Sequence, residues 1–208
     1  MLATKISARN RKRKYDLFLE KINPQKTDKI LDVGFNNTEY SCVDNFLEKT
    51  YPYLDNITAL GIEDGTLFKE RYPSVNTVIY DGKKYPFEDN RFDIGWSNAV
   101  LEHVGDEGAQ ILFLKEIRRT CKRIYLTTPN RYFPFEVHTR YPLIHWLPKR
   151  YFDKILQYTS KKWASGEYMN LLSRKKLEYL LKEAGVKNYK IYKNRFLGFT
   201  MDFSVVII

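Results

Sequence analysis

Three carboxylates in the first half of the chain each close a short apolar run. The runs are Ile30-Leu31-Asp32-Val33-Gly34, Ala59-Leu60-Gly61-Ile62-Glu63 and Val78-Ile79-Tyr80-Asp81-Gly82. Continuous apolar runs are typical of strands that are buried on both faces of a parallel sheet. Ligands of such sheets bind beyond the carboxyl ends of the strands. The three acids therefore predict one ligand that carries several hydrogen-bond donor groups.

The elements that would position these acids alternate along the chain. Apolar residues at helical spacing, together with capping and stop signals, predict helices over Ser7–Ile22, Glu39–Thr50, Asp64–Arg71, Asp106–Arg119 and Arg174–Ala184. Apolar runs predict strands over Lys29–Gly34, Ile57–Ile62, Val75–Tyr80, Phe92–Trp96, Arg123–Thr127, Tyr189–Arg195 and Thr200–Ile208. This order predicts an α/β fold, a doubly wound, mostly parallel seven-stranded sheet with an antiparallel terminal hairpin.

Residues 131–172 break this alternation and are rich in proline and aromatic side chains. We expect them to form an inserted cap after the fifth strand, over the carboxyl edge of the sheet. The whole chain, residues 1–208, is then a single domain with one insertion.

The composition favours a protein that folds without disulfides or metals. Of the 208 residues, 43% are apolar and 15% aromatic, which is enough to fill a core. Cys42 and Cys121 lie in different predicted elements, and neither belongs to a CxxC motif or a Cys/His cluster. We therefore expect two reduced, buried thiols and no metal site.

The charge and the termini bear on location and partners. No apolar run approaches the ~20 residues that span a bilayer, and the first residues, Met1-Leu2-Ala3-Thr4-Lys5, lack the apolar core of a signal peptide. We expect a cytoplasmic protein. The net charge of +10 favours an anionic partner: nucleic acid, a phospholipid surface or a phosphorylated substrate.

The stretch from Tyr85 to Val104, YPFEDNRFDIGWSNAVLEHV, carries the most specific motif. It resembles the "LPF.D..FD…S…LEH" segment of class I S-adenosylmethionine-dependent methyltransferases, of the small-molecule branch that includes the ubiquinone-biosynthesis type. The resemblance covers residues 28–130 well. It implies a seven-stranded sheet with a reversed edge strand, and S-adenosylmethionine as the cofactor.

The resemblance also implies roles for the strand-end residues. Asp32 would lie near the methionine amino group, and Gly34 would let the backbone approach the ligand. Glu63 would accept both ribose hydroxyls, and Asp81, followed by Gly82, would accept from the adenine amine. The alternatives from the residues themselves are a solvated strand-end acid at Glu63 and a simple Asp-Gly turn at Asp81.

Two more positions of the first motif, and one that follows the fourth strand, are relevant to the cofactor. The family usually has glycines where this chain has Asn36 and Thr38. We expect Asn36 to keep the turn, because asparagine accepts left-handed dihedrals, whereas Thr38 is a loss. Asn98 follows the fourth strand and, by the resemblance, holds the methionine moiety; an ordinary helix cap is the alternative.

Methyl transfer is an in-line displacement at the sulfonium methyl group, and a hydroxyl acceptor must also lose a proton. His103 and His138 are the candidate bases, since histidine titrates in the right range. Glu102 precedes His103, but adjacent helical residues do not face each other, so no dyad is expected. The alternative for His103 is a helix-end histidine that is bonded to the backbone.

The predicted cap would face the acceptor. Arg131 and Arg140 are candidates to bind a phosphate or carboxylate of the acceptor by a two-pronged contact. This segment resembles a cap of methyltransferases from bacterial surface-glycan gene clusters, which implies a small or glycan-type acceptor methylated at oxygen. The alternative is that these polar groups only satisfy an irregular, proline-rich loop.

Other functions remain open at this point. An RNA methyltransferase fits the charge, with the cluster from Arg9 to Lys14 as a phosphate contact, although the aromatic base-gripping motif is missing after the fourth strand. A nicotinamide dehydrogenase fits the glycine turn poorly, and a non-catalytic scaffold fits the altered first motif. The mixed aromatic and basic stretch from Trp146 to Phe152 is typical of peripheral membrane contact, and a lipid-linked acceptor would explain it.

Overall fold

The computed structural model describes residues 2–136, 138–139 and 141–208. Its helices are α1 (Leu2–Ile22), α2 (Phe46–Thr50), α3 (Thr66–Arg71), α4 (Glu107–Thr120), α5 (Lys149–Gln157) and α6 (Arg174–Glu183), and its strands are β1 (Ile30–Val33), β2 (Ile57–Gly61), β3 (Asn76–Ile79), β4 (Phe92–Asn98), β5 (Cys121–Pro129), β6 (Tyr189–Phe196) and β7 (Phe199–Ile207). Short 3₁₀ turns occur at Leu54–Asn56, Leu101–His103, Ile144–Trp146, Lys162–Ala164 and Gly166–Tyr168.

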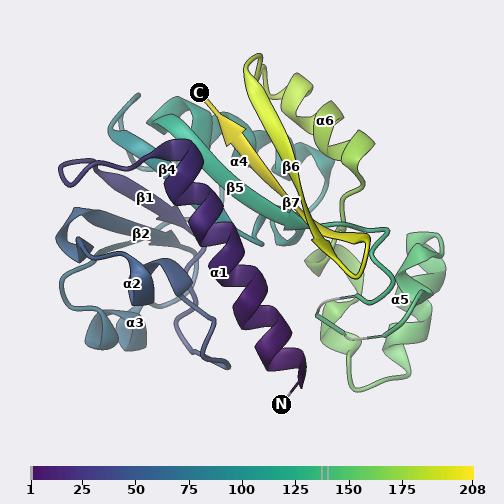
Figure 1. Cartoon of the computed structure of the whole chain (residues 1–208). Coiled ribbons are helices and arrows are strands. Elements are labelled where there is room, and N and C mark those ends of the chain that lie inside the picture. The colour runs from purple at the N-terminus through teal and green to yellow at the C-terminus, as the bar shows by residue number, and fades with distance from the viewer. Residues whose placement is uncertain (1, 137, 140) are drawn as a thin grey trace.

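The strands form one sheet in the order β3-β2-β1-β4-β5-β7-β6 (Figure 1). The first five strands pair in parallel, and β7 pairs antiparallel with both β5 and β6. This confirms the predicted fold class. The chain runs outward from β1 to β3 and then returns to β4 on the other side of β1, so the strand order reverses between β1 and β4. In such sheets a ligand crevice opens at that point of reversal.

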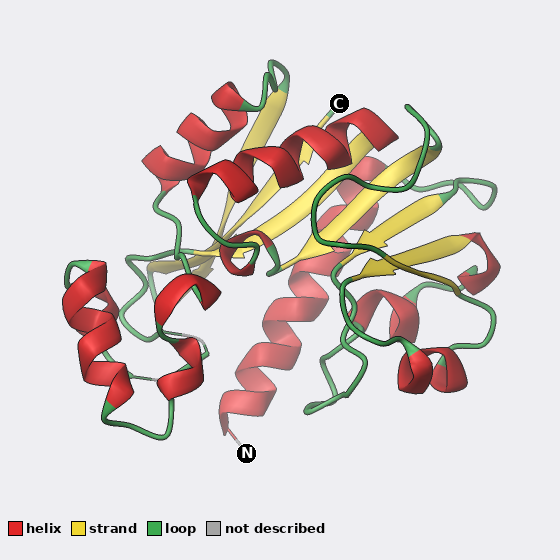
Figure 2. Ribbon diagram, turned by 180° about the vertical axis from the view of Figure 1, so that it is seen from behind, coloured by secondary structure: helices red, strands yellow, loops and turns green. Residues whose placement is uncertain are grey.

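Helices cover both faces of the sheet. Phe18 of α1, Leu47 of α2 and Phe68 of α3 belong to one buried apolar cluster, while Leu114 of α4 and Leu181 of α6 belong to the other. Figure 2, seen from behind, shows α4 and α6 in front of the sheet and α1 behind it. Burial on both faces explains why the central strands are continuous apolar runs in the sequence.

Capping residues set the predicted starts of two helices. The Asp106 side chain accepts a hydrogen bond from the backbone N–H of Ala109 at the start of α4, and the Ser173 side chain accepts one from Lys176 at the start of α6. Such caps satisfy N–H groups that have no partner within the helix. Both helices begin within one residue of the predicted position.

Two predictions about the segment before α2 are wrong. The helix expected over Glu39–Thr50 is only the short α2, because Asn45 adopts a left-handed conformation (φ 48°) directly before it. The residues from Asn36 to Asn45 form an irregular loop instead. Cys42 lies on this loop and is exposed, whereas Cys121 is buried as expected; both cysteines are free thiols.

The cap segment, residues 131–172, connects β5 to α6. It contains α5 and three of the 3₁₀ turns, and it has a small apolar cluster of its own built on Phe152, Leu156, Ala164 and Met169. Its two ends meet at an isolated bridge between Asn130 and Leu172. Among the described residues, no helix is long and apolar enough to cross a bilayer.

Candidate active site

A cleft of about 320 Å³ lies beyond the carboxyl ends of β1, β2 and β4. Seven of the predicted site residues line it: Asp32, Gly34, Asn36, Glu63, Asn98, His103 and His138. They come from four strand ends or turns and from the cap segment. The structure therefore brings most of the predicted cofactor residues and both candidate bases to one cleft.

Asp32 lies on β1 at the floor of this cleft and is buried. Burial raises the pKa of its carboxyl well above the usual range, and the neighbouring Glu48 carboxylate raises it further. Burial also raises the pKa of Glu48, whose two carboxylate oxygens have no hydrogen-bond partner among the described residues. Two buried carboxylates in contact disfavour each other's charged forms, which adds to the effect of burial on this pair.

The turn after β1 requires glycine at position 34. Gly34 has φ +99°, and a Cβ atom there would lie 2.4 Å from a methyl carbon of Val100. The backbone is therefore bare where it faces the cleft. Its N–H donates to the carbonyl of Leu60 on β2, which ties this turn to the neighbouring strand.

The next residue of the motif is held by a side chain from outside it. Asn45 Oδ1 accepts from the backbone N–H of Asn36 at 2.8 Å, and Asn45 Nδ2 donates to the carbonyl of Asn36 at 2.9 Å. The left-handed residue of this loop is Asn45 and not Asn36, so the predicted dihedral role of Asn36 is wrong. The clamp stabilises the loop at the point where the family has a glycine turn. The sequence pattern predicts a helix here and gives no sign of this loop.

Glu63 and Asp81 follow the ends of neighbouring strands. Gly61 pairs with Ile79 in register, so the two acids start from adjacent positions. Glu63 is exposed and lines the cleft. Asp81 and Gly82 are exposed but are not among the residues that line it, and Asp81 accepts a hydrogen bond from the backbone of Lys83 at 3.0 Å.

Asn98 ends β4 and lines the cleft from the opposite side of β1. Its Oδ1 accepts from the hydroxyl of Thr127 on β5 at 2.7 Å, which orients the amide. The following residue, Ala99, has φ +61°, a left-handed conformation that is uncommon for a residue with a Cβ atom. The strand therefore turns sharply into the 3₁₀ turn that carries Glu102 and His103.

Both candidate bases lie at one end of the cleft and face each other. His103 Nε2 is 3.2 Å from His138 Nε2. His103 Nδ1 is 2.9 Å from the carbonyl oxygen of Tyr168, and His138 Nδ1 is 2.8 Å from a carboxylate oxygen of Glu136. Because both Nδ1 partners are acceptors, each ring carries its proton on Nδ1 when it is neutral.

Charges around His138 set its titration. Burial lowers the pKa of His138, but the hydrogen bond and the charge of Glu136 outweigh burial and raise it above the usual value. Burial raises the pKa of Glu136, but contacts with His138 and with the backbone N–H of Thr139 dominate and hold it at about 2. Glu136 is therefore ionised at neutral pH and orients the His138 ring.

Glu102 lies near the ring of His103, although the sequence predicts no contact between them. Its Oε1 is 3.8 Å from His103 Nε2, although the two residues are adjacent in the chain. The expectation of no contact assumed an α-helix, whereas these residues lie in a 3₁₀ turn directly after a strand. Glu102 is fully buried, and its Oε2 accepts from the hydroxyl of Thr128 at 2.9 Å.

Arg11 was not singled out as a site residue in the sequence, where it is one of a basic run in the first helix. In the structure α1 crosses the sheet, and Arg11 lines the cleft. Burial lowers the pKa of its guanidinium, and Asp44, Asp202 and Glu102 oppose that effect. Within the described part of the chain, no hydrogen bond or ion pair is made by this guanidinium. The amphipathic pattern of α1 indicates a buried face, but not what that face meets.

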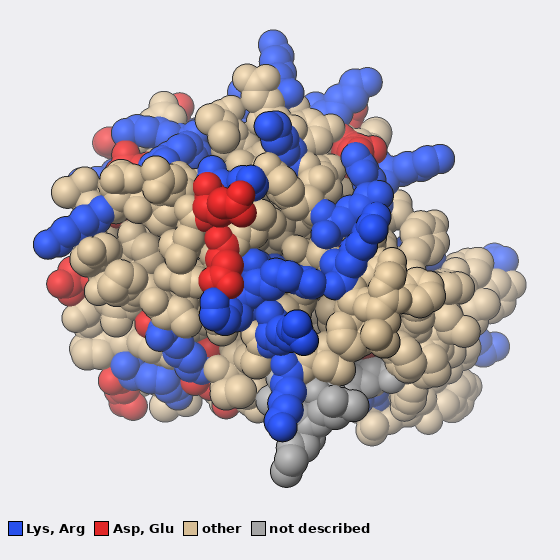
Figure 3. All heavy atoms as spheres, in the orientation of Figure 1, with Lys and Arg blue, Asp and Glu red and all other residues tan. Residues whose placement is uncertain are grey.

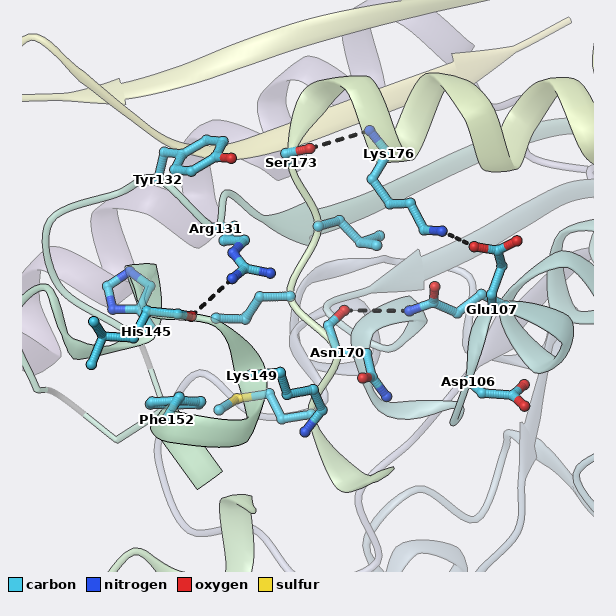
Figure 4. A pocket seen from close by; sticks show the side chains of 15 residues that line it. Asp106, Glu107, Arg131, Tyr132, His145, Lys149, Phe152, Asn170, Ser173 and Lys176 are labelled. Atoms are coloured by element: carbon cyan, nitrogen blue, oxygen red, sulfur yellow. Dashed lines mark hydrogen bonds and ion pairs between the residues drawn. The ribbon is translucent and has the colours of Figure 1, made fainter. Parts of the chain in front are cut away.

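Arg131 lies in a different pocket, of about 390 Å³, between the cap segment and the starts of α4 and α6 (Figure 4). Its guanidinium donates to the carbonyl oxygen of Leu147 at 3.0 Å. His145 and Lys176 line the same pocket. The structure therefore does not bring Arg131 to the strand-end cleft. Arg140, the other predicted acceptor residue, lies outside the described residues.

Comparison with protein families identifies the central part of the chain. Residues 31–123, from β1 into β5, match the model of a methyltransferase domain. This part of the chain is therefore similar to a methyltransferase domain. The match spans the resembled segment Tyr85 to Val104, and it confirms the prediction of an enzyme that uses S-adenosylmethionine. The search of curated proteins finds no relative of this chain.

Solved structures share the fold of this chain. A S-adenosylmethionine-dependent methyltransferase from Methanosarcina mazei is 18% identical, with a TM-score of 0.55 over 88% of this chain and 92% of that one. The PH0226 protein from Pyrococcus horikoshii is 15% identical, with a TM-score of 0.60 over 93% and 86%. The N-terminal domain of EvdMO1, solved with S-adenosylhomocysteine bound, is 19% identical, with a TM-score of 0.57 over 95% and 80%. At these identities the likeness establishes the fold.

Proposed function

We propose that the strand-end cleft binds S-adenosylmethionine and that its methyl group passes to an oxygen atom of a small or glycan-type, anionic acceptor. This proposal rests on one observation: a single cleft is lined by three candidate cofactor residues and by both candidate bases. These residues are Asp32, Glu63, Asn98, His103 and His138. The acids suit a ligand that has an ammonium group, a sulfonium and ribose hydroxyls. The bare backbone at Gly34 leaves room for such a ligand to approach.

The positions of the candidate cofactor residues support the roles that we propose for them. Glu63 is the acceptor for the ribose hydroxyls, since its carboxylate is exposed in the cleft. Asp32 lies at the floor, where the methionine ammonium group would stabilise its ionised form. Asp81 and Gly82 remain candidates for the adenine end, because the strand register places them beside Glu63, just outside the lining.

The acceptor is assigned to the end of the cleft where the two histidines lie. The acceptor hydroxyl is presented there to His103 and His138, which handle its proton, and S-adenosylmethionine supplies an activated methyl group. Arg11 replaces Arg131 as the group that binds the acceptor's anion. Arg11 lines the same cleft as His103 and His138, and its guanidinium donors have no partner among the described residues.

The acceptor assignment is tested by a transfer assay with labelled S-adenosylmethionine. Phosphorylated and carboxylated sugars, lipid-linked sugars and matched neutral sugars are offered to the wild type and to Arg11→Gln. We expect transfer to an anionic acceptor, and a loss of at least tenfold in kcat/KM for Arg11→Gln, because a charge-assisted hydrogen bond contributes about 1.5–3 kcal/mol.

The control for this assay is Arg9→Gln, on the same helix but exposed and outside the cleft. Equal activity on neutral and anionic acceptors, with Arg11→Gln unchanged, would contradict the anionic assignment. Transfer to RNA that falls steeply with salt would favour the alternative, an RNA methyltransferase. That alternative draws on a basic band along α1 (Figure 3), in which Lys5, Arg9 and Arg13 line a groove with Arg195.

We also propose peripheral contact with an anionic membrane surface, at the cytoplasmic face. The cap segment exposes Trp146, Leu147 and Tyr151 next to the exposed Arg150. Aromatic and apolar side chains that are interleaved with basic ones suit the headgroup region of a bilayer. A lipid-linked acceptor would then be presented to the cleft from that surface.

A further inference from the structure

We propose that Glu102, His103 and His138 bind one divalent transition-metal ion at the acceptor end of the cleft. Each residue offers one ligand atom, and the three atoms lie within 4.8 Å of one another. The two imidazole Nε2 atoms are 3.2 Å apart, a separation that two nitrogen ligands at ~2.1 Å from one ion also have. We call these three residues the histidine cluster.

The outer hydrogen bonds of both rings prepare them as ligands. The carbonyl oxygen of Tyr168 and the carboxylate of Glu136 accept from the Nδ1 atoms, so the lone pairs of the neutral rings lie on Nε2. Histidines that bind metals characteristically donate their other N–H to a carbonyl or a carboxylate. Two facing lone pairs repel each other, so a cation must lie between them: either a proton or a metal ion.

The third ligand atom favours a metal ion over a single proton. Glu102 Oε1 is buried and has no hydrogen-bond partner among the described residues, while Oε2 of the same carboxylate is satisfied by Thr128. A buried carboxylate oxygen without a partner is costly. One proton between the two rings leaves that oxygen unpaired, whereas an ion bound by the two Nε2 atoms also takes Oε1 as a ligand after small side-chain movements.

The ligand set points to a class of ion. Two imidazoles and one carboxylate suit Zn²⁺, Mn²⁺, Fe²⁺, Co²⁺ or Ni²⁺ better than Mg²⁺ or Ca²⁺, which prefer oxygen ligands only. The sequence does not indicate this site, because His138 lies 35 positions after His103 and the three residues match no metal-binding spacing.

The role of the ion rests on the proposed function, whereas its binding does not. His103 and His138 line the cleft, so an ion held by them would lie where the acceptor is proposed to bind. An acceptor hydroxyl on the ion would lose its proton to water more readily, as metal-bound water does. Its oxygen would then form the bond to the methyl carbon, while the carbon–sulfur electron pair goes to sulfur. In this scheme His103 and His138 promote the loss of the acceptor proton by holding the ion, without taking the proton on either ring.

The test uses the full chain after removal of metal with a chelator. Titration with Co²⁺ gives visible absorption that reports nitrogen ligands, and calorimetry with Zn²⁺ gives the stoichiometry and the dissociation constant. We expect one ion per chain, a loss of at least tenfold in affinity for His103→Gln and for His138→Gln, and a loss of about 10–100-fold for Glu136→Gln, the outer partner. His145→Gln is the matched control, because His145 is buried in the other pocket.

Two outcomes would overturn the inference. One is no binding of Co²⁺ or Zn²⁺ by the wild type; the other is binding that His103→Gln and His138→Gln leave unchanged. Each variant is also titrated with S-adenosylhomocysteine, which shows that its cleft is folded. If the wild type binds S-adenosylhomocysteine but no metal, only this inference is contradicted. If it binds metal but no S-adenosylhomocysteine, only the proposed function is contradicted.

Discussion

Asp32 and Glu48 are the two residues whose chemistry departs most from that of surface acids. Both are buried, and burial is the main cause of the raised pKa of each carboxyl. A group whose folded-state pKa is raised above its unfolded value favours the folded state less as pH rises. For a carboxyl group this loss of stability begins above the unfolded pKa of about 4 and continues to the folded pKa.

We therefore predict that Glu48→Gln stabilises the protein at pH 7–8. The amide has no charge to desolvate, and it can donate a hydrogen bond to Asp32. Removing a buried carboxylate whose oxygens lack a hydrogen-bond partner is worth about 1 kcal/mol or more, so we expect a rise in Tm of about 2–4 °C at pH 8. This rise should disappear below about pH 4, where the carboxyl is protonated in the unfolded chain as well. Thermal unfolding monitored by circular dichroism measures it, with the exposed Glu70→Gln as control. A lower Tm for Glu48→Gln at pH 8 would contradict this account.

Site residues that lie on or directly after a strand can be predicted from the sequence, whereas site residues that depend on distant contacts cannot. Asp32, Glu63, Asn98 and His103 each lie on or just after a strand, so the topology alone brings them to one edge. Arg11 reaches the cleft only because α1 packs across the sheet, and no local pattern shows where that helix lies. The same holds for Arg131, which follows β5 but turns into the other pocket.

At the scale of elements, the loop between β1 and α2 differs most from its prediction. Residues 39–45 contain no proline or glycine, and their apolar spacing is compatible with a helix. Tertiary contacts override that preference: Asn45 binds the backbone of Asn36, and its Nδ2 also donates to Glu39 at 3.0 Å. The Asn45 side chain thus holds the backbone at Asn36, the position where the resembled family usually has a glycine.

We predict that Asn45→Ala weakens cofactor binding more than it weakens the fold. The variant loses hydrogen bonds that hold Asn36 beside the cleft, and alanine also disfavours the left-handed dihedrals at this position. We expect a loss of about 1–2 kcal/mol in the free energy of unfolding and a fall of at least tenfold in affinity for S-adenosylhomocysteine. Urea unfolding and calorimetry measure the two effects. Asn45→Gly keeps the backbone but not the clamp; if it bound as tightly as the wild type, the clamp would have no role.

The strands were predicted more accurately than this loop, for a physical reason. Each central strand is buried on both faces, so its apolar run is continuous and its ends are marked by polar or turn residues. The largest difference among the parallel strands is at β5, which extends from Cys121 to Pro129 because β7 pairs with its second half. That pairing joins segments about 75 positions apart, which local composition does not encode.

At the scale of the whole molecule, the sheet divides the protein into two apolar cores with one cleft at the strand-reversal point. The positive charge is not spread evenly: part of it lies in the basic band along α1, visible in Figure 3. The predicted phosphate contact of the cluster from Arg9 to Lys14 is split by the fold, because Arg9, Lys12 and Arg13 are exposed while Lys14 is buried and lies 3.9 Å from Asp202.

We predict that the protein binds anionic vesicles through the cap segment. Co-sedimentation with phosphatidylserine-containing vesicles should exceed that with neutral vesicles and should fall as salt is raised. Trp146→Ser combined with Tyr151→Ser should reduce the bound fraction severalfold, because both side chains are exposed apolar surface. The exposed Tyr179→Ser on α6 serves as control. Absence of pelleting at low salt would rule out the membrane contact.

The central claim is that the cleft at the ends of β1, β2 and β4 holds the adenosyl cofactor, and its most direct test is calorimetry with S-adenosylhomocysteine. The account predicts one ligand bound per chain, with affinity at least tenfold weaker in Glu63→Gln, since a hydrogen bond to a charged group contributes about 1.5–3 kcal/mol, and unchanged in Glu70→Gln. No binding by the wild type, or equal binding by the wild type and Glu63→Gln, would contradict it.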